Sequence, residues 1–152
     1  MIYLLRHGDA EQGGDDAARE LTEKGERQAE TAGRALAALG AELDACLTSP
    51  KTRAEQTADL ACRPLGVRVE IAAELSGGPF DPRRLADGRG DVLLVGHEPD
   101  FSNAVAELTG ARVKLRKGGI ACFEEDLLHA LLRPKDLRRI AAGKGEVSAS
   151  AG

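Results

Sequence analysis

The sequence predicts an α/β domain whose layers pack around a largely parallel sheet. Three observations support this prediction. Short apolar runs at residues 2–5 and 91–95 each end in a polar cluster, as buried parallel strands often do. Amphipathic helical patterns separate the apolar runs. The 152 residues suffice to bury an aliphatic core but not to build two large domains.

In the first half of the chain, strands and helices are expected to alternate. A strand at Ile2–Leu5 precedes a loop over residues 11–16. Thr22 is expected to cap a helix that runs to Leu39 and stops at Gly40. The buried face of this helix is expected to consist of Ala29, Ala32, Leu36 and Leu39. A second strand is expected at Leu43–Thr48, followed by a helix with Ser49 as N-cap and Pro50 at its first position that ends near Cys62. A half-exposed strand at Val67–Ile71 comes next.

The second half is expected to complete the sheet. Residues 76–90 are rich in turn-forming residues and predict a loop with one helical turn near residues 83–86. Residues 1–140 are expected to form a single domain, and residues 141–152 a frayed tail. The remaining elements are a strand at Asp91–Val95, a helix at Asp100–Leu108 that stops at Gly110, and two antiparallel strands at Ile120–Phe123 and Ala130–Leu132.

Composition limits the partners. The chain has 21 Lys and Arg against 25 Asp and Glu and a net charge of −4, so no global basic field recruits nucleic acid or membrane lipid. Any affinity for anions must therefore be local. Cys46, Cys62 and Cys122 form no metal-binding or disulfide pattern, and no apolar run could serve as a signal peptide or span a bilayer. A reduced, cytoplasmic protein is expected.

Two histidines and two arginines are the candidate site residues. His7 follows the first strand directly, His97 follows the strand at residues 91–95, and each has a glycine neighbour. Arg6 precedes His7, and Arg53 lies in the helix after the second strand. Carboxyl ends of parallel strands share one edge of a sheet, so these side chains are expected to converge there. His129 lies among leucines and is expected to be a packed or surface residue.

This residue set predicts recognition of a phosphoryl group. A guanidinium offers a planar, always-charged fork of donors that suits phosphoryl oxygens, and helix N-termini add backbone N–H donors. No metal is expected, because arginine repels cations and no carboxylate or second histidine stands at ligand spacing. The chain also lacks the Gly-x-Ser-x-Gly motif of serine hydrolases and the P-loop.

Four segments resemble the histidine phosphatase superfamily, in matching order and spacing, over residues 2–134. This resemblance implies a phosphoglycerate-mutase-like fold, a three-layer α/β/α sandwich with a mostly parallel central sheet, here without a cap domain. The small size, Lys117-Gly118-Gly119 before a strand and the late Leu132-Arg133-Pro134-Lys135 resemble the short bacterial phosphohistidine phosphatases most. The segments are Leu5-Arg6-His7-Gly8-Asp9-Ala10, Leu21-Thr22-x-x-Gly25-x-x-Gln28-Ala29, Ser49-Pro50-x-x-Arg53-Ala54-x-Gln56-Thr57 and Val95-Gly96-His97-Glu98-Pro99.

The resemblance implies a metal-independent phosphohydrolase without a cofactor. His7 would be the nucleophile and form a phosphohistidine intermediate, while Arg6, Arg53 and His97 would bind the phosphoryl oxygens. The expected substrate is a phosphohistidine-bearing protein, and the enzyme is expected to be a monomer. Two alternatives remain open: a phosphatase for small phosphate monoesters, and a module that binds phosphate or phosphohistidine without turnover.

The proton donor is the point where the sequence departs from the family pattern. Many relatives use an acid in the middle of the chain, and the candidates are Glu74 or Asp9, with Glu98 third. None matches a strong acid motif, and a structural role for Glu74 is equally open. Imidazole leaves more readily than an alkoxide once protonated. A missing acid would therefore favour phosphohistidine or other phosphoramidate substrates.

Overall fold

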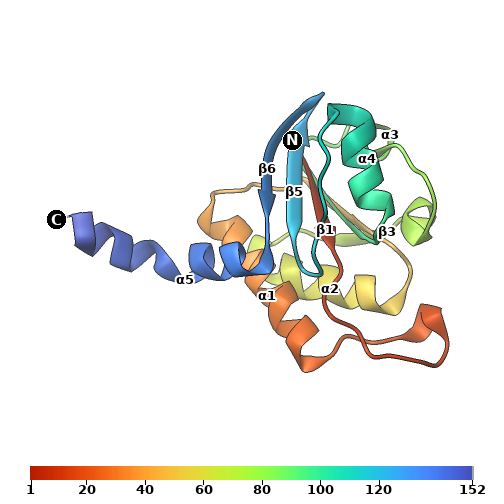
Figure 1. Ribbon diagram of the computed structural model, residues 1–152, viewed down its shortest axis with the longest axis horizontal. Coiled ribbons are helices and arrows are strands. Elements are labelled where there is room, and N and C mark those ends of the chain that lie inside the picture. Colours follow the sequence, from red (N-terminus) through yellow and green to blue (C-terminus); the bar gives the residue numbers. More distant parts are fainter. Residues whose placement is uncertain (152) are drawn as a thin grey trace.

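A computed structural model shows a six-stranded sheet with helices on both faces (Figure 1). It describes residues 1–143 with their side chains and the backbone of residues 144–151. The strands, in spatial order β3-β2-β4-β1-β5-β6, are β1 (Ile2–Arg6), β2 (Ala45–Thr48), β3 (Val69–Ile71), β4 (Val92–Gly96), β5 (Ile120–Glu124) and β6 (Leu127–Leu132). The helices are α1 (Glu23–Ala38), α2 (Thr52–Cys62), α3 (Pro82–Ala86), α4 (Asp100–Thr109) and α5 (Pro134–Ala151), with 3-10 turns η1 (Asp16–Ala18), η2 (Arg63–Leu65) and η3 (Ala73–Ser76).

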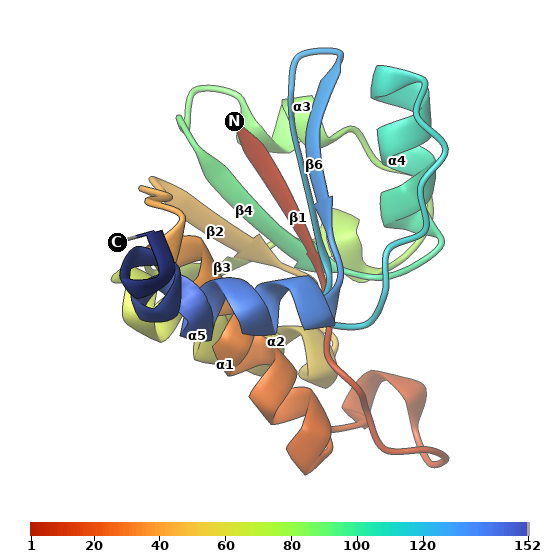
Figure 2. The same cartoon turned by 60° about the vertical axis from the view of Figure 1, so that its left-hand side comes forward.

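The sheet is mostly parallel, as the sequence predicts. β3, β2, β4 and β1 pair in parallel, and β5 and β6 add an antiparallel hairpin at one edge. α1, α2 and α5 cover one face and α3 and α4 the other, which gives the predicted three-layer sandwich (Figure 2). Side chains alternate between the faces: Leu4 and Leu94 pack with α4, and Leu5 and Val95 pack with α1 and α2.

The register of the parallel strands sets the positions of the site residues. Arg6 pairs with Gly96 in adjacent β1 and β4, and Thr48 pairs with Val95 in β2 and β4. His7 and His97 therefore emerge side by side from the carboxyl ends of β1 and β4. Ser49 emerges from β2 on the other side of β4. No other domain covers this edge in the part of the chain that the structure describes.

Two sequence-based boundaries at helices were wrong. Ser49 and Pro50 do not begin α2, because the amide of Ser49 donates to Val95 O (2.9 Å) and so continues the sheet ladder; Lys51 is the N-cap. Leu39 is not part of the buried face of α1. It is the C-cap residue and its side chain is 54% exposed, whereas Thr22 caps the helix as predicted and accepts from Gly25 N.

The C-terminal part also differs from the prediction. β6 begins at Leu127 rather than Ala130, because a tight turn joins it to β5 and Glu125 takes a left-handed conformation there (φ 55°). α5 was missed. Its Leu137 is fully buried against α1, and its backbone continues to Ala151. The predicted frayed tail at 141–152 falls largely on residues whose side chains lie outside the described part.

No helix within the described residues has both the length and the apolar character needed to cross a membrane.

Candidate active site

His7 is held in one tautomer by its two ring contacts. Nδ1 lies 2.7 Å from the carbonyl oxygen of Gly8, and Nε2 lies 3.4 Å from the Nε–H of Arg53. A carbonyl only accepts and a guanidinium only donates. Nδ1 must therefore carry the proton, which leaves a lone pair on Nε2. That lone pair is what a nucleophile needs.

His7 is also kept neutral by its surroundings. Burial, which is the largest cause, and the cations Arg53, Arg6 and Lys117 together lower the pKa of the imidazole from 6.5 to about 4, against the opposing effect of the Gly8 hydrogen bond. The sequence predicts a neutral His7 because of the flanking arginines. The direction is confirmed, but burial is the larger cause.

His97 faces His7 across the end of the sheet, with ring centroids 5.2 Å apart. Its Nε2 lies 2.8 Å from the hydroxyl of Ser49. Burial, followed by His7 and Arg53, lowers the pKa of His97 to about 3, so this ring is neutral as well. Ser49 Oγ already accepts from the amide of Lys51 (3.1 Å), so its own proton is available to Nε2. When Ser49 donates this proton to Nε2, the Nδ1 of His97 carries the ring proton and can donate it to a ligand.

Two buried nitrogens at this site have no hydrogen-bond partner among the described residues: Nδ1 of His97 and Nε of Arg6. The guanidinium of Arg6 is fixed instead through Nη1, which donates to Leu115 O (3.1 Å). Leaving a buried polar group unsatisfied costs about 1–3 kcal/mol. Two such groups beside His7 are therefore a signature of an anion-binding site.

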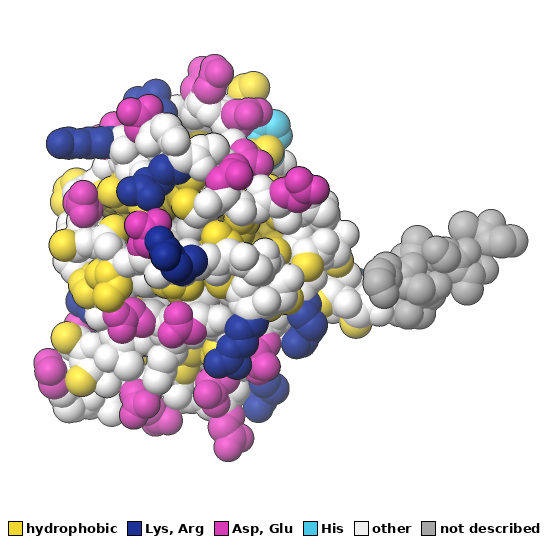
Figure 3. Space-filling view, turned by 180° about the vertical axis from the view of Figure 1, so that it is seen from behind, with side chains coloured by type: hydrophobic (Ala, Val, Ile, Leu, Met, Phe, Trp, Pro, Cys, Tyr) yellow, Lys and Arg dark blue, Asp and Glu magenta, His cyan; other side chains and the backbone are white. Residues whose placement is uncertain are grey.

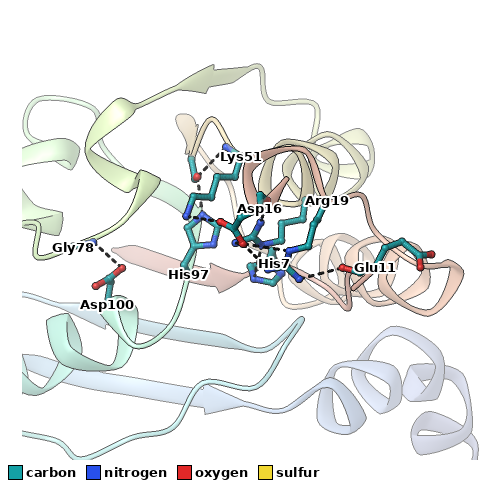
Figure 4. A network of polar contacts seen from close by, with 10 residues as sticks. His7, Glu11, Asp16, Arg19, Lys51, Gly78, His97 and Asp100 are labelled. Atoms are coloured by element: carbon teal, nitrogen blue, oxygen red, sulfur yellow. Dashed lines mark hydrogen bonds and ion pairs between the residues drawn. The ribbon is translucent and has the colours of Figure 1, made fainter. Parts of the chain in front are cut away.

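Asp16 is a site residue that the sequence did not single out. Its carboxylate contacts three cations: Arg19 Nη2 at 3.0 Å, Lys51 Nζ at 3.3 Å and Arg53 Nη2 at 3.5 Å. Figure 4 shows it between Lys51 and Arg19, on the side where the two histidines face each other. The hydrogen bonds from Arg19 and then Lys51 lower its pKa to about 2. The sequence places Asp16 at the end of a loop without periodicity, and an Asp-x-x-Arg spacing is too common to mark it.

Helices α1 and α2 hold the loop that follows β1. Gly8 N donates to Thr57 Oγ1 of α2 (3.1 Å), and Asp9 N donates to Gln28 Oε1 of α1 (2.8 Å). Gly25 lies so close to Asp9 that a Cβ there would overlap the carbonyl oxygen of Asp9. These contacts explain the presence of Gly25, Gln28 and Thr57 in the sequence segments that resemble the superfamily. Their task is to fix the backbone beside His7.

All four residues predicted to form the site line one cavity of about 400 Å³. Glu74 and Asp9 do not line it. Glu74 is exposed in η3, and Asp9 accepts from Thr22 Oγ1 (2.8 Å) and pairs with Lys117 (3.3 Å). The cavity is lined by Arg6, His7, Ala10, Asp16, Arg19, Lys51, Arg53, Ser76, Gly77, His97, Glu98, Asp100 and Lys117.

The other two acids in the cavity have structural partners. Glu98 accepts from the amide (2.8 Å) and hydroxyl (2.5 Å) of Ser102 in α4. Asp100 accepts from the amide of Gly78 (3.1 Å; Figure 4). His129 lies elsewhere, exposed on β6, in line with its exclusion from the site. No group of three or more His, Cys, Asp and Glu within the described residues is arranged to hold a metal ion.

Comparison with known proteins agrees with this geometry. Residues 2–79 match the model of the histidine phosphatase superfamily (branch 1). An uncharacterized protein from a Picosynechococcus species is 37% identical over 134 residues, which cover 78% of this chain and 81% of that protein. The mitochondrial serine/threonine-protein phosphatase Pgam5 of Drosophila ananassae is 38% identical over 87 residues, 54% of this chain but only 30% of Pgam5.

Solved structures share the fold. The protein histidine phosphatase SixA complexed with tungstate superimposes with a TM-score of 0.78 at 25% identity, over 90% of this chain and 98% of SixA. The alpha-ribazole phosphatase of Shigella flexneri superimposes with a TM-score of 0.68 at 18% identity, over 88% and 96%. Fold and site together define a hydrolase of the phosphatase class. The chain belongs to the histidine phosphatase superfamily.

Proposed function

We propose that the protein is a phosphohistidine phosphatase and that His7 carries the phosphoryl group between two displacement steps. The observation that carries this proposal is the lone pair of His7 Nε2 beside Arg53, with Nδ1–H fixed on Gly8 O. This arrangement supplies a neutral nucleophile and a positive charge at the same point. The unpartnered nitrogens of Arg6 and His97 and the amino group of Lys51 surround it.

The first step transfers the phosphoryl group from substrate to enzyme. Nε2 of His7 attacks phosphorus in line with the scissile P–N bond, a bond forms from Nε2 to phosphorus, and the P–N electron pair returns to the substrate imidazole. Solvent protonates the substrate ring on its other nitrogen before this bond breaks, so the ring leaves as a neutral imidazole. Arg6, Arg53 and His97 are proposed to bind the three equatorial oxygens, where charge spreads in the transition state. The Gly8 hydrogen bond stabilises the positive charge that forms on the His7 ring.

The second step regenerates the enzyme. Water attacks the phosphorus on His7, the Nε2–P bond breaks with its electron pair returning to Nε2, and inorganic phosphate leaves. The attacking water gives up one proton to solvent or to the departing phosphate. Neither Glu74 nor Asp9 lines the cavity, and both carboxylate oxygens of Glu98, which does line it, already accept from Ser102, so we assign no carboxylic acid to the leaving group. A protonated imidazole leaves without that help, whereas an alkoxide does not leave readily.

Substrate class is inferred from the same features. The described residues place no cap over the cavity, which lets a side chain on another protein reach His7. The likeness to SixA, a protein histidine phosphatase, supports the same choice. Three free cysteines accord with a reduced, cytoplasmic setting, and we extend the proposal to a monomer without nucleic-acid or membrane partners.

A phosphate-ester phosphatase is the second candidate function. Pgam5 is named a serine/threonine-protein phosphatase, and its matched segment covers 54% of this chain. The two functions differ in the leaving group. A panel of phosphohistidine peptide, phosphoserine peptide, sugar phosphate and aryl phosphate, assayed with metal chelated, separates them. We expect the wild-type protein to release phosphate rapidly from the phosphohistidine peptide and the His7→Ala variant to release none.

Two outcomes would count against the proposal. Preference for the phosphoserine peptide would replace it with the ester phosphatase. Tight binding of phosphohistidine peptide without phosphate release would leave a binding module.

A further inference from the structure

A second groove adjoins the active-site cavity. Its volume is about 670 Å³, and it lies where the end of β1, the first turn of α1, the segment before β5 and the start of α5 meet. Arg6 and Lys117 line both the groove and the active-site cavity. The groove is lined by Arg6, Asp9, Lys24, Gln28, Lys114, Arg116, Lys117, Arg133, Pro134, Lys135 and Arg138.

The groove concentrates positive charge on an acidic protein. Eight of the 21 Lys and Arg residues line it, with Asp9 as the single carboxylate, although the whole chain has a net charge of −4. The opposite arrangement is seen on the face in Figure 3, where basic and acidic side chains are interspersed. The clustering in the groove thus contrasts with the mixed charges on that face.

Most of these cations are available to a ligand. Lys117 pairs with Asp9 (3.3 Å) and Arg133 with Asp136 (2.9 Å). The other six form no ion pair with any described residue, and all of them except Arg6 are exposed. Like charges this close repel one another, and a ligand with several negative charges removes that repulsion.

The backbone that carries the basic residues of the groove is held in place by buried neighbours. Leu137 of α5 and Leu115, next to Lys114 and Arg116, are both buried to 1% exposure or less. Gln28 of α1 packs against Gly118. The backbone that carries these cations is thus held in place along a surface that continues into the cavity with His7.

We infer that this groove binds an acidic protein surface that flanks the phosphorylated side chain of the substrate. The inference rests on the proposed function, since it concerns the protein that would present phosphohistidine to His7. A phosphorylated side chain that enters the cavity brings its neighbouring residues over the groove, because Arg6 and Lys117 join the two. Glutamates and aspartates there would meet Lys114, Arg116 and Lys135. The groove would select acidic substrate proteins and speed their association with the enzyme, and the cavity would carry out the reaction.

Matched peptides test this inference. Each of two synthetic peptides contains a single histidine that has been phosphorylated with phosphoramidate. In the first peptide this histidine is flanked by glutamates, and in the second it is flanked by serines. We expect the KM of the wild-type protein to be about tenfold lower for the glutamate peptide at low salt, from a few rim ion pairs. The difference should shrink as salt is added.

A charge-reversal variant locates the effect. Lys114→Glu, Arg116→Glu and Lys135→Glu combined should abolish the preference for the glutamate peptide while changing kcat/KM for phosphoimidazole less than threefold. The matched control combines Arg63→Glu, Arg68→Glu and Arg84→Glu, three exposed arginines outside the groove. It changes net charge equally and should keep the preference.

Direct binding separates the groove from the proposed reaction. The unphosphorylated glutamate peptide, measured by fluorescence anisotropy, should bind wild type and control but not the groove variant. If the protein hydrolysed none of the substrates, the proposed function would be refuted. The binding of the unphosphorylated peptide would still test the groove, because it does not depend on hydrolysis. The inference is overturned if the groove variant binds the peptide as wild type does, or if wild type binds inorganic polyphosphate and ignores the peptide.

Discussion

Arg53 donates a 2.7 Å hydrogen bond from Nη1 to the main-chain oxygen of Asp16, and its Nη2 lies 3.5 Å from the carboxylate of the same residue. An anion from the protein itself thus occupies the cations that a phosphoryl group needs. Asp16→Asn should free them and lower the orthovanadate concentration that half-inhibits the enzyme by about three- to tenfold. Inhibition titrations measure this.

Asp100→Asn is the control for Asp16→Asn. Asp100 lines the same cavity, but among the described residues its carboxylate accepts only from Gly78 N, so this variant removes one negative charge without freeing Lys51 or Arg53. A smaller effect than that of Asp16→Asn is expected. Equal effects of the two variants would show that Asp16 acts only through its negative charge and not through its contacts with Lys51 and Arg53. Weaker vanadate binding in Asp16→Asn would show that Asp16 positions Arg53 instead of competing with the ligand.

Arg53→Lys should lower kcat about 10²- to 10³-fold, because an ammonium cannot reach His7 Nε2, Asp16 and a phosphoryl oxygen together as the guanidinium fork does. Arg63→Lys, exposed just beyond α2, should retain full activity. Steady-state kinetics with a phosphohistidine peptide provides the measurement. A kcat for Arg53→Lys within threefold of wild type would remove Arg53 from the transition state.

The two site histidines should make stability depend on pH. Their pKa values fall from 6.5 to about 4 in His7 and about 3 in His97, so below pH 6.5 the unfolded chain binds more protons than the folded one. The free energy of unfolding should therefore be fully supported above pH 6.5 and decrease between pH 6.5 and 5. The slope is at most about 1.4 kcal/mol per pH unit for each histidine.

Urea unfolding across this range checks the prediction. His97→Gln should give a flatter profile than wild type, and His129→Gln, on exposed β6, should match wild type. A wild-type protein whose stability stays constant or rises as the pH falls to 5 would be inconsistent with two buried neutral histidines.

Gly33 is the close contact between α1 and α2. A Cβ at this position would overlap the carbonyl oxygen of Ala61, so Gly33→Ala must push the two helices apart. We expect a loss of about 1–3 kcal/mol in unfolding free energy with nearly unchanged kcat. Arg34→Ala, one residue further on the exposed side, should cost much less. A Gly33→Ala protein as stable as wild type would show that the helices can separate freely.

The convergence of Arg6, His7, Arg53 and His97 was predictable because it depends on few features. Each histidine follows an apolar run, and the runs proved to be adjacent parallel strands whose carboxyl ends share one edge. Arg53 is the second residue of α2, the helix that follows the neighbouring parallel strand β2. The pattern requires no knowledge of loop conformation.

Asp16 and the basic groove could not be predicted in the same way. Asp16 reaches the site through a loop that α1 and α2 hold by side-chain bonds, and such contacts leave no periodic signal. The groove depends on α5, whose small, polar sequence after residue 141 was interpreted as a tail. Pro134 at the first helical position and Asp136, which accepts from Arg133 N (2.9 Å), were the signals of a helix start.

Trapping the phosphoryl group on the enzyme tests the central claim most directly. Wild-type protein is mixed with ³²P-phosphohistidine peptide in the presence of a metal chelator, quenched in alkali within milliseconds and digested for mapping. The account predicts an alkali-stable, acid-labile label on the peptide that contains His7, which rises and then decays as phosphate appears. His129→Gln should behave identically, and His7→Ala should show neither label nor turnover. Phosphate release by His7→Ala, or turnover of wild type without label on His7, would contradict the account.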